Sequence, residues 1–542
     1  MIGKEYLALL QPWIKAAKKY LYRFPERPEL GFYGTGTNAW GVQTNTKAFS
    51  AFAVLATDPE IDEKEIGMTR EELLNWSLAL LRFTMQSHIE GDYSCTDGTS
   101  WGHTWISGLA IERMMHGVEA IKEYLTEEDK ILLKKVLVSE SDWLMDYYPI
   151  EAGPVENNKP ESNLWNGAIL YRTATLYPNL PRVNEYREKG TQFLINSISI
   201  PSDAQSSKEV DGKKVSEWYI GNNFFESYAL NHHRYMNVGY MLLCLSNVAM
   251  LHFMYREKGL KPPESLYHHV EDLWKLVKTF IFPDGRLLRI GGDTRVRYCY
   301  CQDYLIPTLL MIEDKYGDAD CKKLEQNWLK IVKKEQDYNG DGSFFSKRLV
   351  KIANVSPLYY TRLESDRAAA LSMGLYWRRI FSHDEENKEK TGDGRNIQIL
   401  TSWKDDYHGA CLQRSDNRIA SWVWEAAEKP QGLCLPPGRS DMAEWHINLA
   451  GEIKGMGCFN NNRIEYHEEY LFKKGFITYG KITVHSENFL AEREIDRDIA
   501  KEKIVFAALP DDATVLIMQY AKSLNRDYFK SIKGLFLQIP ND

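Results

Sequence analysis

A short segment rich in histidine, arginine and tyrosine carries the side chains best suited to proton transfer. Residues 226–235 read ESYALNHHRY. Near neutral pH an imidazole can accept a proton and a phenol can donate one. We predict a helix through this segment, which would place His232 and Tyr235 on one face and His233 on the neighbouring row. The pattern favours an acid–base site; the alternative is a polar helix start with hydrogen-bonded surface histidines.

A second segment offers an amide that could bind a carboxylate. Residues 161–172 read ESNLWNGAILYR, and Ser162 or Asn163 could simply cap the expected helix. Asn166 lies one turn further in, where asparagine is a poor helix former, beside Trp165 and a glycine. An amide in this position is a candidate for holding the carboxylate of a substrate.

Arginine and tryptophan side chains in two loops are candidates for substrate binding. Residues 282–298 read FPDGRLLRIGGDTRVRY, in which Arg295 or Arg297 could hold an anion through two hydrogen bonds. Residues 92–105 read DYSCTDGTSWGHTW and place Trp101 and Trp105 before an expected helix. These rings could stack on a sugar or could pin the loop by being buried.

Three side chains near the C-terminal end could complete a cleft formed mainly by the earlier part of the chain. His408 lies in the sequence YHG, and residues 436–446 read PPGRSDMAEWH, with Arg439 and His446. His446 follows a tryptophan in an expected strand, so one of the two side chains faces inward.

The elements that must position these residues change in kind along the chain. Apolar residues recur at helical spacing through residues 1 to about 370, separated by loops rich in Gly, Asn and Pro. We expect helices at residues 6–22, 71–85, 105–123, 127–147, 164–177, 225–255 and 266–280. Helical hairpins in this rhythm are typical of a toroid or solenoid of paired helices, an (α/α) arrangement.

The sequence after about residue 373 has the pattern of an antiparallel β-sandwich or barrel. Short β-branched and aromatic runs alternate with turn residues at intervals of roughly ten. These runs are residues 396–401, 419–424, 445–449, 463–467, 476–480, 504–508 and 513–518. We therefore predict a multidomain protein, α then β: a helical catalytic domain at residues 1–375, a linker at 376–395 and an antiparallel β-sandwich at 396–542.

Composition excludes several classes of protein. The 542 residues carry a formal net charge of −8, which argues against nucleic-acid binding, and 12% of them are aromatic. We find no phosphate-binding loop and no stretch of 18 apolar residues, so we expect no cofactor, no nucleic acid and no membrane. The first residues lack a signal-peptide pattern, which predicts a cytoplasmic protein, or a periplasmic or secreted one if a leader has been removed.

The order of these pieces resembles the heparinase II/III-like polysaccharide lyases, which join an (α/α) toroid to an antiparallel β-sandwich. Residues 225–235 look like that family's Glu-x-Ser-x-x-Tyr-His-x-Tyr segment, residues 289–293 (RIGGD) look like its Ile-Gly-Asp loop, and residues 163–166 (NLWN) look like its Asn-rich helix start. The chain departs from the family where Trp165-Asn166-Gly167 replaces Asn-Asn-His, and where His232-His233 replaces Tyr-His.

The resemblance implies an enzyme that cleaves a uronic-acid-containing glycan by β-elimination, with an acidic poly- or oligosaccharide as its substrate. Asn166, together with Arg297, would neutralise the uronate carboxylate so that a base can remove the C5 proton. His232 or His233 would be that base, Tyr235 the acid, and His408 or His446 would reach in from the β-domain. The sequence leaves the glycan and the oligomeric state open.

Two other functions compete with the lyase. A glycoside hydrolase on an (α/α) barrel needs two carboxylates across the scissile bond, for which Glu226, Asp97 and Asp293 are candidates. A non-catalytic carbohydrate-binding relative is suggested by the histidine missing from the Asn-Asn-His position.

Overall fold

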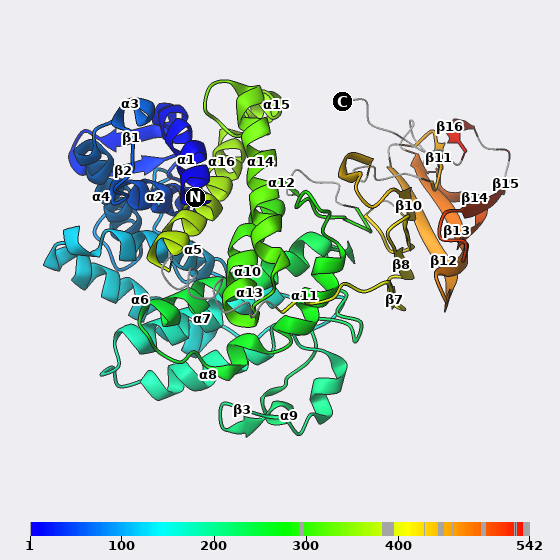
Figure 1. The fold of residues 1–542 in the computed structure, drawn as a ribbon, viewed down its shortest axis with the longest axis horizontal. Coiled ribbons are helices and arrows are strands. Elements are labelled where there is room, and N and C mark those ends of the chain that lie inside the picture. The colour runs from blue at the N-terminus through cyan, green and yellow to red at the C-terminus, as the bar shows by residue number, and fades with distance from the viewer. Residues whose placement is uncertain are drawn as a thin grey trace.

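The computed structural model describes residues 2–292, 298–381, 395–427, 429–442, 449–457, 459–488, 495–524, 526 and 528–534. A helical region comes first and antiparallel strands follow, and the two lie side by side (Figure 1). The α-helices are α1 Ile2–Ala17, α2 Trp40–Ala56, α3 Glu63–Ile66, α4 Arg70–Gln86, α5 Ser107–Ala120, α6 Glu127–Tyr147, α7 Pro160–Leu176, α8 Val183–Ile195, α9 Val215–Trp218, α10 Val238–Glu257, α11 Val270–Thr279, α12 Tyr298–Asp303, α13 Leu305–Tyr316, α14 Asp320–Asn339, α15 Val350–Val355 and α16 Pro357–Ile380.

Short elements connect these helices. The 3-10 helices are η1 Lys18–Tyr20, η2 Lys122–Tyr124, η3 Pro201–Gln205 and η4 Glu264–Tyr267, and η5 Ser440–Met442 lies among the later strands. Three two-stranded hairpins pair β1 Leu21–Phe24 with β2 Arg27–Tyr33, β3 Glu209–Val210 with β4 Lys213–Lys214, and β5 Asn231–His232 with β6 Tyr235–Met236.

Local sequence signals set where the outer helices begin and which face they bury. Thr69 begins α4 and Thr126 begins α6 with reciprocal capping boxes, in which a threonine and an acidic side chain three residues later each bind the other's backbone N–H. In α14 the buried residues recur every three or four positions, so one stripe faces the core. By contrast α2 and α10 are buried on all sides and form the interior of the region.

Helix α10 begins much later than its apolar pattern predicts. The expected helix over residues 225–255 is wrong before residue 238, because Asn237 caps α10 by accepting a hydrogen bond from the backbone N–H of Tyr240 at 3.1 Å. By length and composition α10 could cross a membrane, yet the whole apolar window is buried inside the protein. One such helix is weak evidence for a membrane span, since a core helix passes the same test.

The later strands form antiparallel sheets. The four-stranded sheets have the orders β10-β9-β8-β7 and β12-β13-β14-β15, and β11 pairs with β16. The strands are β7 Ser402–Asp405, β8 Ala410–Arg414, β9 Ile419–Val423, β10 Gln431–Leu435, β11 Glu452–Gly455, β12 Phe459–Phe472, β13 Gly475–Asn488, β14 Ile495–Ala508, β15 Val515–Ser523 and β16 Phe529–Lys533.

Two of the predicted strands and the predicted linker are not found as strands or as a linker among the described residues. Residues 396–401 are not a strand, because Thr279 and Lys278 at the end of α11 bind the backbone of Leu400 and Ile397 instead. The strand expected at 445–449 falls mostly outside the described residues, as does most of the linker expected at 376–395, whose first five residues belong to α16.

The two faces of the β7–β10 sheet belong to different apolar cores. Ala410, Leu412 and Val423 join the core of the helical region, whereas Cys411 and Trp422 join a second core with the β12–β15 sheet. Successive strand residues point to opposite faces, so this alternation places the β7–β10 sheet between the helices and the second sheet. Asp405 at the end of β7 and His408 in the following loop contact Ser227 and Asn231 of the segment that carries the candidate histidines.

Candidate active site

The histidines lie on a tight β-hairpin and not on a helix. His232 pairs with Tyr235 across the hairpin, and His233 and Arg234 form its two-residue turn with φ of 59° and 71°. Two consecutive positive φ values define the turn favoured in such hairpins, which is normally made by Gly or Asn. The expectation that His232 and Tyr235 share a helix face is therefore wrong, because cross-strand pairing and a backbone bond from Met236 to Glu425 replace the helix.

The turn places both imidazoles against the first turn of α10. His233 Nε2 lies 3.2 Å from the phenolic oxygen of Tyr240. The ring of His232 lies 3.9 Å, centre to centre, from that of Tyr240. His232 Nδ1 lies 3.2 Å from the side-chain oxygen of Asn158, and its Nε2 lies 3.8 Å from Glu161. Two imidazoles and one phenol thus occupy a single small site.

This site opens into a cavity of about 310 Å³ among α2, α5, α7, α10 and α16. Its size is at the lower end of that typical for small-molecule sites. Its described lining residues are Trp40, Lys47, Trp105, Ile106, Leu109, Arg113, Asn158, Lys159, Glu161, Trp165, His232, His233, Tyr240, Leu243, Asn247, Tyr304, Arg362 and Asp366. Aromatic rings and charged groups together line the cavity, which suits a polar ring-shaped ligand.

Basic side chains outnumber acidic ones around the cavity. Arg113 donates to Asn247 at 3.0 Å and lies over the Tyr304 ring at 3.6 Å, while Arg362 lies over the Trp40 ring at 3.7 Å. With Lys47 and Lys159, four cationic side chains stand against two carboxylates among the described residues of the lining. The local charge therefore favours an anionic ligand although the whole chain is acidic.

One cation of the cavity, Lys47, is held in a buried ion pair. Lys47 Nζ lies 2.6 Å from Asp366, and both side chains are almost completely buried. Tyr304 donates to the same carboxylate at 2.9 Å. Burial lowers the pKa of Lys47 to about 8, although Asp366 opposes the shift. Lys47 therefore loses its charge at a lower pH than an ordinary lysine.

No family model matches this chain, and no curated protein matches its sequence.

Of the three tryptophans predicted to bind substrate, Trp105 and Trp165 line the cavity and Trp101 does not. Trp105 is partly exposed and lines the cavity, and Trp165 donates from its indole to the Trp105 carbonyl at 3.1 Å. Trp101 is buried, donates to the Thr84 carbonyl at 2.7 Å and does not line the cavity. The alternative interpretation, a loop pinned by a buried ring, fits Trp101.

Two other predicted residues lie close to the site but do not line the cavity. Asn166 is fully buried, and neither atom of its amide has a hydrogen-bond partner among the described residues. Tyr235 is buried on β6, and the phenols that line the cavity are those of Tyr240 and Tyr304. The turn thus directs both imidazoles toward Tyr240 at the start of α10.

The β-domain reaches the hairpin through His408. His408 is fully buried, with Nδ1 2.6 Å from Asp405 and Nε2 3.4 Å from the Asn231 side-chain oxygen. Burial alone would raise the pKa of Asp405, but the hydrogen bond from His408 holds it below its usual value. His408 thus contacts the hairpin strand and does not line the cavity, so its position suits support of the hairpin.

The remaining predicted residues are not part of the cavity or lie outside the described residues. Arg439 is exposed and forms an ion pair with Asp441. Arg295, Arg297, His446 and Asp293 lie outside the described residues. The two hydrolase candidates that are described bind backbone N–H groups instead, Asp97 that of Asn38 at 3.0 Å and Glu226 that of Ser202 at 3.1 Å.

Sequence reasoning missed the phenol and the cations of the cavity. Tyr240, Arg113 and Arg362 come from α10, α5 and α16, which are far apart in sequence. The signal available for Arg113 was its place beside Glu112 among the apolar residues of α5, because a buried charge requires a partner or a ligand.

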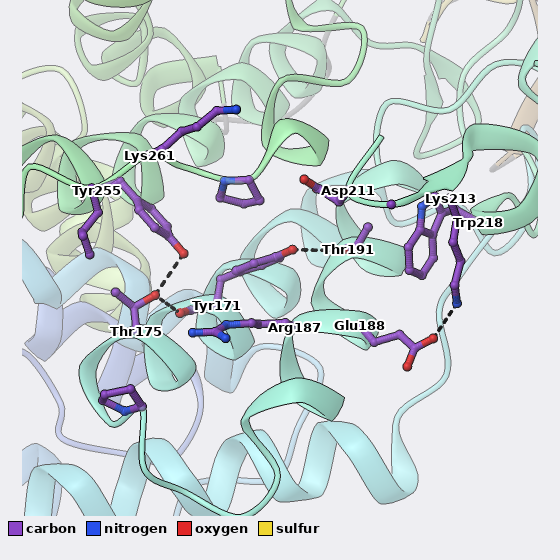
Figure 2. Close-up of a pocket in the computed structure, with 14 residues that line it drawn as sticks. Tyr171, Thr175, Arg187, Glu188, Thr191, Asp211, Lys213, Trp218, Tyr255 and Lys261 are labelled. Carbon is purple, nitrogen blue, oxygen red and sulfur yellow. Dashed lines mark hydrogen bonds and ion pairs between the residues drawn. The ribbon is translucent and has the colours of Figure 1, made fainter. Parts of the chain in front are cut away.

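A larger cavity of about 870 Å³ lies elsewhere in the helical region (Figure 2). Its hydroxyls bind one another: Tyr171 with Thr191 at 2.5 Å, and Thr175 with Tyr255 at 2.9 Å. Burial raises the pKa of Tyr171 to about 12, and no histidine is among the described residues of its wall. Size alone would favour this cavity, but it lacks a base that titrates near neutral pH.

Proposed function

We propose that the protein is a polysaccharide lyase that cleaves a uronic-acid-containing glycan by β-elimination. The observation that carries this proposal is the His233–Tyr240 pair beside His232, inside a cavity with an excess of cationic side chains. β-Elimination requires neutralisation of a carboxylate, a base for the C5 proton and an acid for the departing O4. The cavity supplies a side chain for each task.

The roles follow from position. Arg113, Arg362 and Lys159 would neutralise the uronate carboxylate, which makes the C5 proton more acidic. His232 or His233 would take that proton, and Tyr240 would donate its phenolic proton to O4 as the C4–O4 bond breaks. The electron pair left at C5 then forms the C4–C5 double bond. The walls formed by Trp105 and Trp165 would stack on neighbouring sugar rings.

The fold is compatible with this assignment. In the family that the sequence resembles, an (α/α) toroid carries the site and a β-sandwich packs beside it. The inner and outer helices, and the two four-stranded sheets that share an apolar core, support the same arrangement here. We extend the proposal to that architecture, with the helical domain ending at the end of α16, Ile380, rather than at residue 375.

A glycoside hydrolase is the second candidate, because two carboxylates line the cavity. Glu161 lies 3.8 Å from His232, and Asp366 is bound by Lys47 and Tyr304. A hydrolase would need both groups free to act across one bond. Since Asp366 is already held in a buried ion pair, the arrangement favours elimination.

A panel of glycans separates these functions. The protein would be incubated with uronate-containing glycans and with their carboxyl-reduced forms, while the ultraviolet absorbance of a 4,5-unsaturated uronate is followed. The lyase predicts that absorbance rises with at least one acidic glycan and with none of the reduced forms. New reducing ends without this absorbance would support the hydrolase, and binding without turnover would support a carbohydrate-binding protein.

A further inference from the structure

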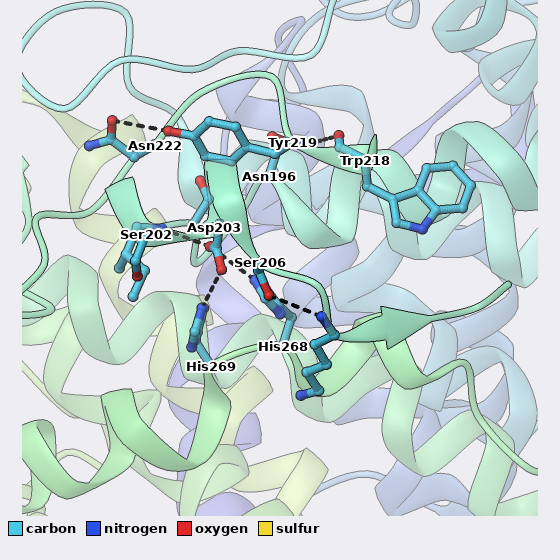
Figure 3. Close-up of polar contacts among 12 residues, drawn as sticks. Asn196, Ser202, Asp203, Ser206, Trp218, Tyr219, Asn222, His268 and His269 are labelled. Atoms are coloured by element: carbon cyan, nitrogen blue, oxygen red, sulfur yellow. Dashed lines mark hydrogen bonds and ion pairs between the residues drawn. The ribbon is translucent and has the colours of Figure 1, made fainter. Parts of the chain in front are cut away.

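A cluster of two histidines and one aspartate lies in the helical region, and none of its three residues lines either cavity (Figure 3). Asp203 belongs to η3, and His268 and His269 lie between η4 and α11. His268 Nε2 lies 3.1 Å from one oxygen of Asp203, and His269 Nε2 lies 2.9 Å from the other. Segments more than sixty residues apart thus direct two imidazole nitrogens at one carboxylate.

We propose that Asp203, His268 and His269 bind a divalent first-row transition-metal ion, of which zinc is the test ion. The three candidate ligand atoms all lie within 4.8 Å of one another. Zinc binds imidazole nitrogen and carboxylate oxygen at about 2.0–2.2 Å, which separates ligand atoms by about 3.3 Å in a tetrahedral site. The two nitrogen–oxygen separations, 3.1 and 2.9 Å, would need to open by only a few tenths of an ångström. Two imidazoles favour such an ion over calcium or magnesium.

The backbone is shaped to bring the two rings together. His269 has φ of 54°, a left-handed conformation that a residue with a side chain rarely adopts. Adjacent rings then lie 4.0 Å apart, centre to centre, on the same side of the chain. Conformations of this kind persist where the surrounding structure over-determines them, and they concentrate at binding sites.

The outer nitrogen of His269 has the partners that orient a metal-bound imidazole. Its Nδ1 lies 2.9 Å from the Tyr228 hydroxyl and 3.8 Å from Asp272. Tyr228 also donates to Asp272 at 3.4 Å. Histidines that bind metals through Nε2 usually donate from Nδ1 to a neighbouring oxygen, which fixes the ring orientation. Nε2 of His269 is thereby directed at Asp203.

Burial and access are also suited to an ion. The side chains of Asp203 and His268 are 4% and 3% exposed, whereas that of His269 is 19% exposed. Three protein ligands leave one tetrahedral position for water, and the exposed side of His269 provides its entry. The backbone N–H of Ile200 already donates to Asp203 at 3.0 Å and holds the carboxylate in place.

The ion would tie three segments together. It joins η3 to the start of α11, and through Tyr228 it reaches the loop that precedes the His232–His233 hairpin. None of its three ligands lines the cavity of His232 and Tyr240, so the ion does not depend on the proposed lyase reaction. Zinc binding and turnover can therefore fail separately.

The test measures zinc binding by the full chain after treatment with a chelator. Calorimetric titration should give one equivalent of zinc, and zinc should raise the unfolding temperature. His268→Ala and Asp203→Asn should abolish both effects, and Tyr228→Phe should weaken binding about tenfold to a hundredfold. The matched control is His485→Gln, which removes another histidine–carboxylate pair, in which Nδ1 lies 3.0 Å from Asp498.

Several results would overturn the proposal. These are no zinc binding by the wild-type chain, unchanged binding in both Asp203→Asn and His268→Ala, or binding lost in His232→Ala instead. Circular dichroism identifies a variant that fails to fold, and Asp203→Asn, which is nearly isosteric, then decides. A hydrogen-bonded cluster without a metal would show the first of these results.

Discussion

The Nε2 atom of His233 lies 3.2 Å from the phenolic oxygen of Tyr240, and the two residues come from a hairpin turn and a helix start. An imidazole and a phenol in hydrogen-bond contact can exchange a proton or act in sequence on one substrate. The pair is the structural basis of the elimination proposed for this cavity.

Removal of the phenolic hydroxyl should show whether Tyr240 or Tyr235 acts as the acid. We expect Tyr240→Phe to lower kcat about 10²–10⁴-fold, because general acid–base groups contribute factors of this size. Tyr235→Phe is the matched control and should leave kcat unchanged, since Tyr235 does not line the cavity. Steady-state rates of unsaturated-uronate formation measure both. Loss of activity in Tyr235→Phe alone would show that Tyr235, and not Tyr240, is the acid.

Arg362 should act on substrate binding through its charge. We expect Arg362→Met to raise KM for an acidic glycan about tenfold or more, because charge-assisted hydrogen bonds contribute about 1.5–3 kcal/mol. The methionine keeps most of the contact with Trp40, over which the guanidinium lies at 3.7 Å. A carboxyl-reduced glycan that binds equally well to both proteins is the matching control. Equal KM values of the wild-type protein and Arg362→Met for the acidic glycan would show that Arg362 does not bind the carboxylate.

The depressed pKa of Lys47 gives a pH dependence with a defined sign. Burial lowers this pKa to about 8, so the cavity loses one positive charge as pH rises through 8. We expect KM for an acidic glycan to increase above about pH 8, and Lys47→Met to show a raised KM with no such increase. The unfolded chain holds this proton up to its ordinary pKa, so the contribution of Lys47 to the free energy of unfolding grows between these pH values. Parallel pH profiles of the two proteins would contradict this assignment.

Glycine in place of Arg234, the second residue of the hairpin turn, should relieve backbone strain. Arg234 has φ of 71°, and the left-handed conformation costs a non-glycine residue about 1–2 kcal/mol. After the entropy that glycine loses on folding, Arg234→Gly should stabilise the protein by about 0.5–1 kcal/mol. Arg234→Ala removes the same side chain without relieving the backbone and should give no gain. Equal unfolding temperatures for the two variants would show that the turn carries no strain.

The order of helices and strands could be predicted from the sequence because it rests on local signals. The helix over residues 127–147 is found as expected, with Thr126 as its cap. Trp105, Trp165, His232 and His233 were identified from residue type and neighbours, and the structure brings them to one cavity. These features depend on residues within a few positions of one another.

What failed depends on partners distant in sequence. Residues 231–236 form a hairpin in which Met236 donates to the Glu425 carbonyl at 3.2 Å, and no local pattern contains that partner. On a helix Tyr235 would share the face of His232, whereas the hairpin directs both imidazoles toward the phenol of Tyr240. Lys47 and Asp366 are joined across more than 300 residues, so a single sequence gives no sign of their pairing.

The most direct test of the central claim is the mass of the products from one defined acidic oligosaccharide. β-Elimination predicts a new non-reducing-end fragment that is lighter by one water molecule than the hydrolysis product, and one unsaturated uronate for each new reducing end. Both signals should fall together in Tyr240→Phe and persist in Tyr235→Phe. Fragments that have gained the elements of water, with no unsaturated uronate, would contradict the account.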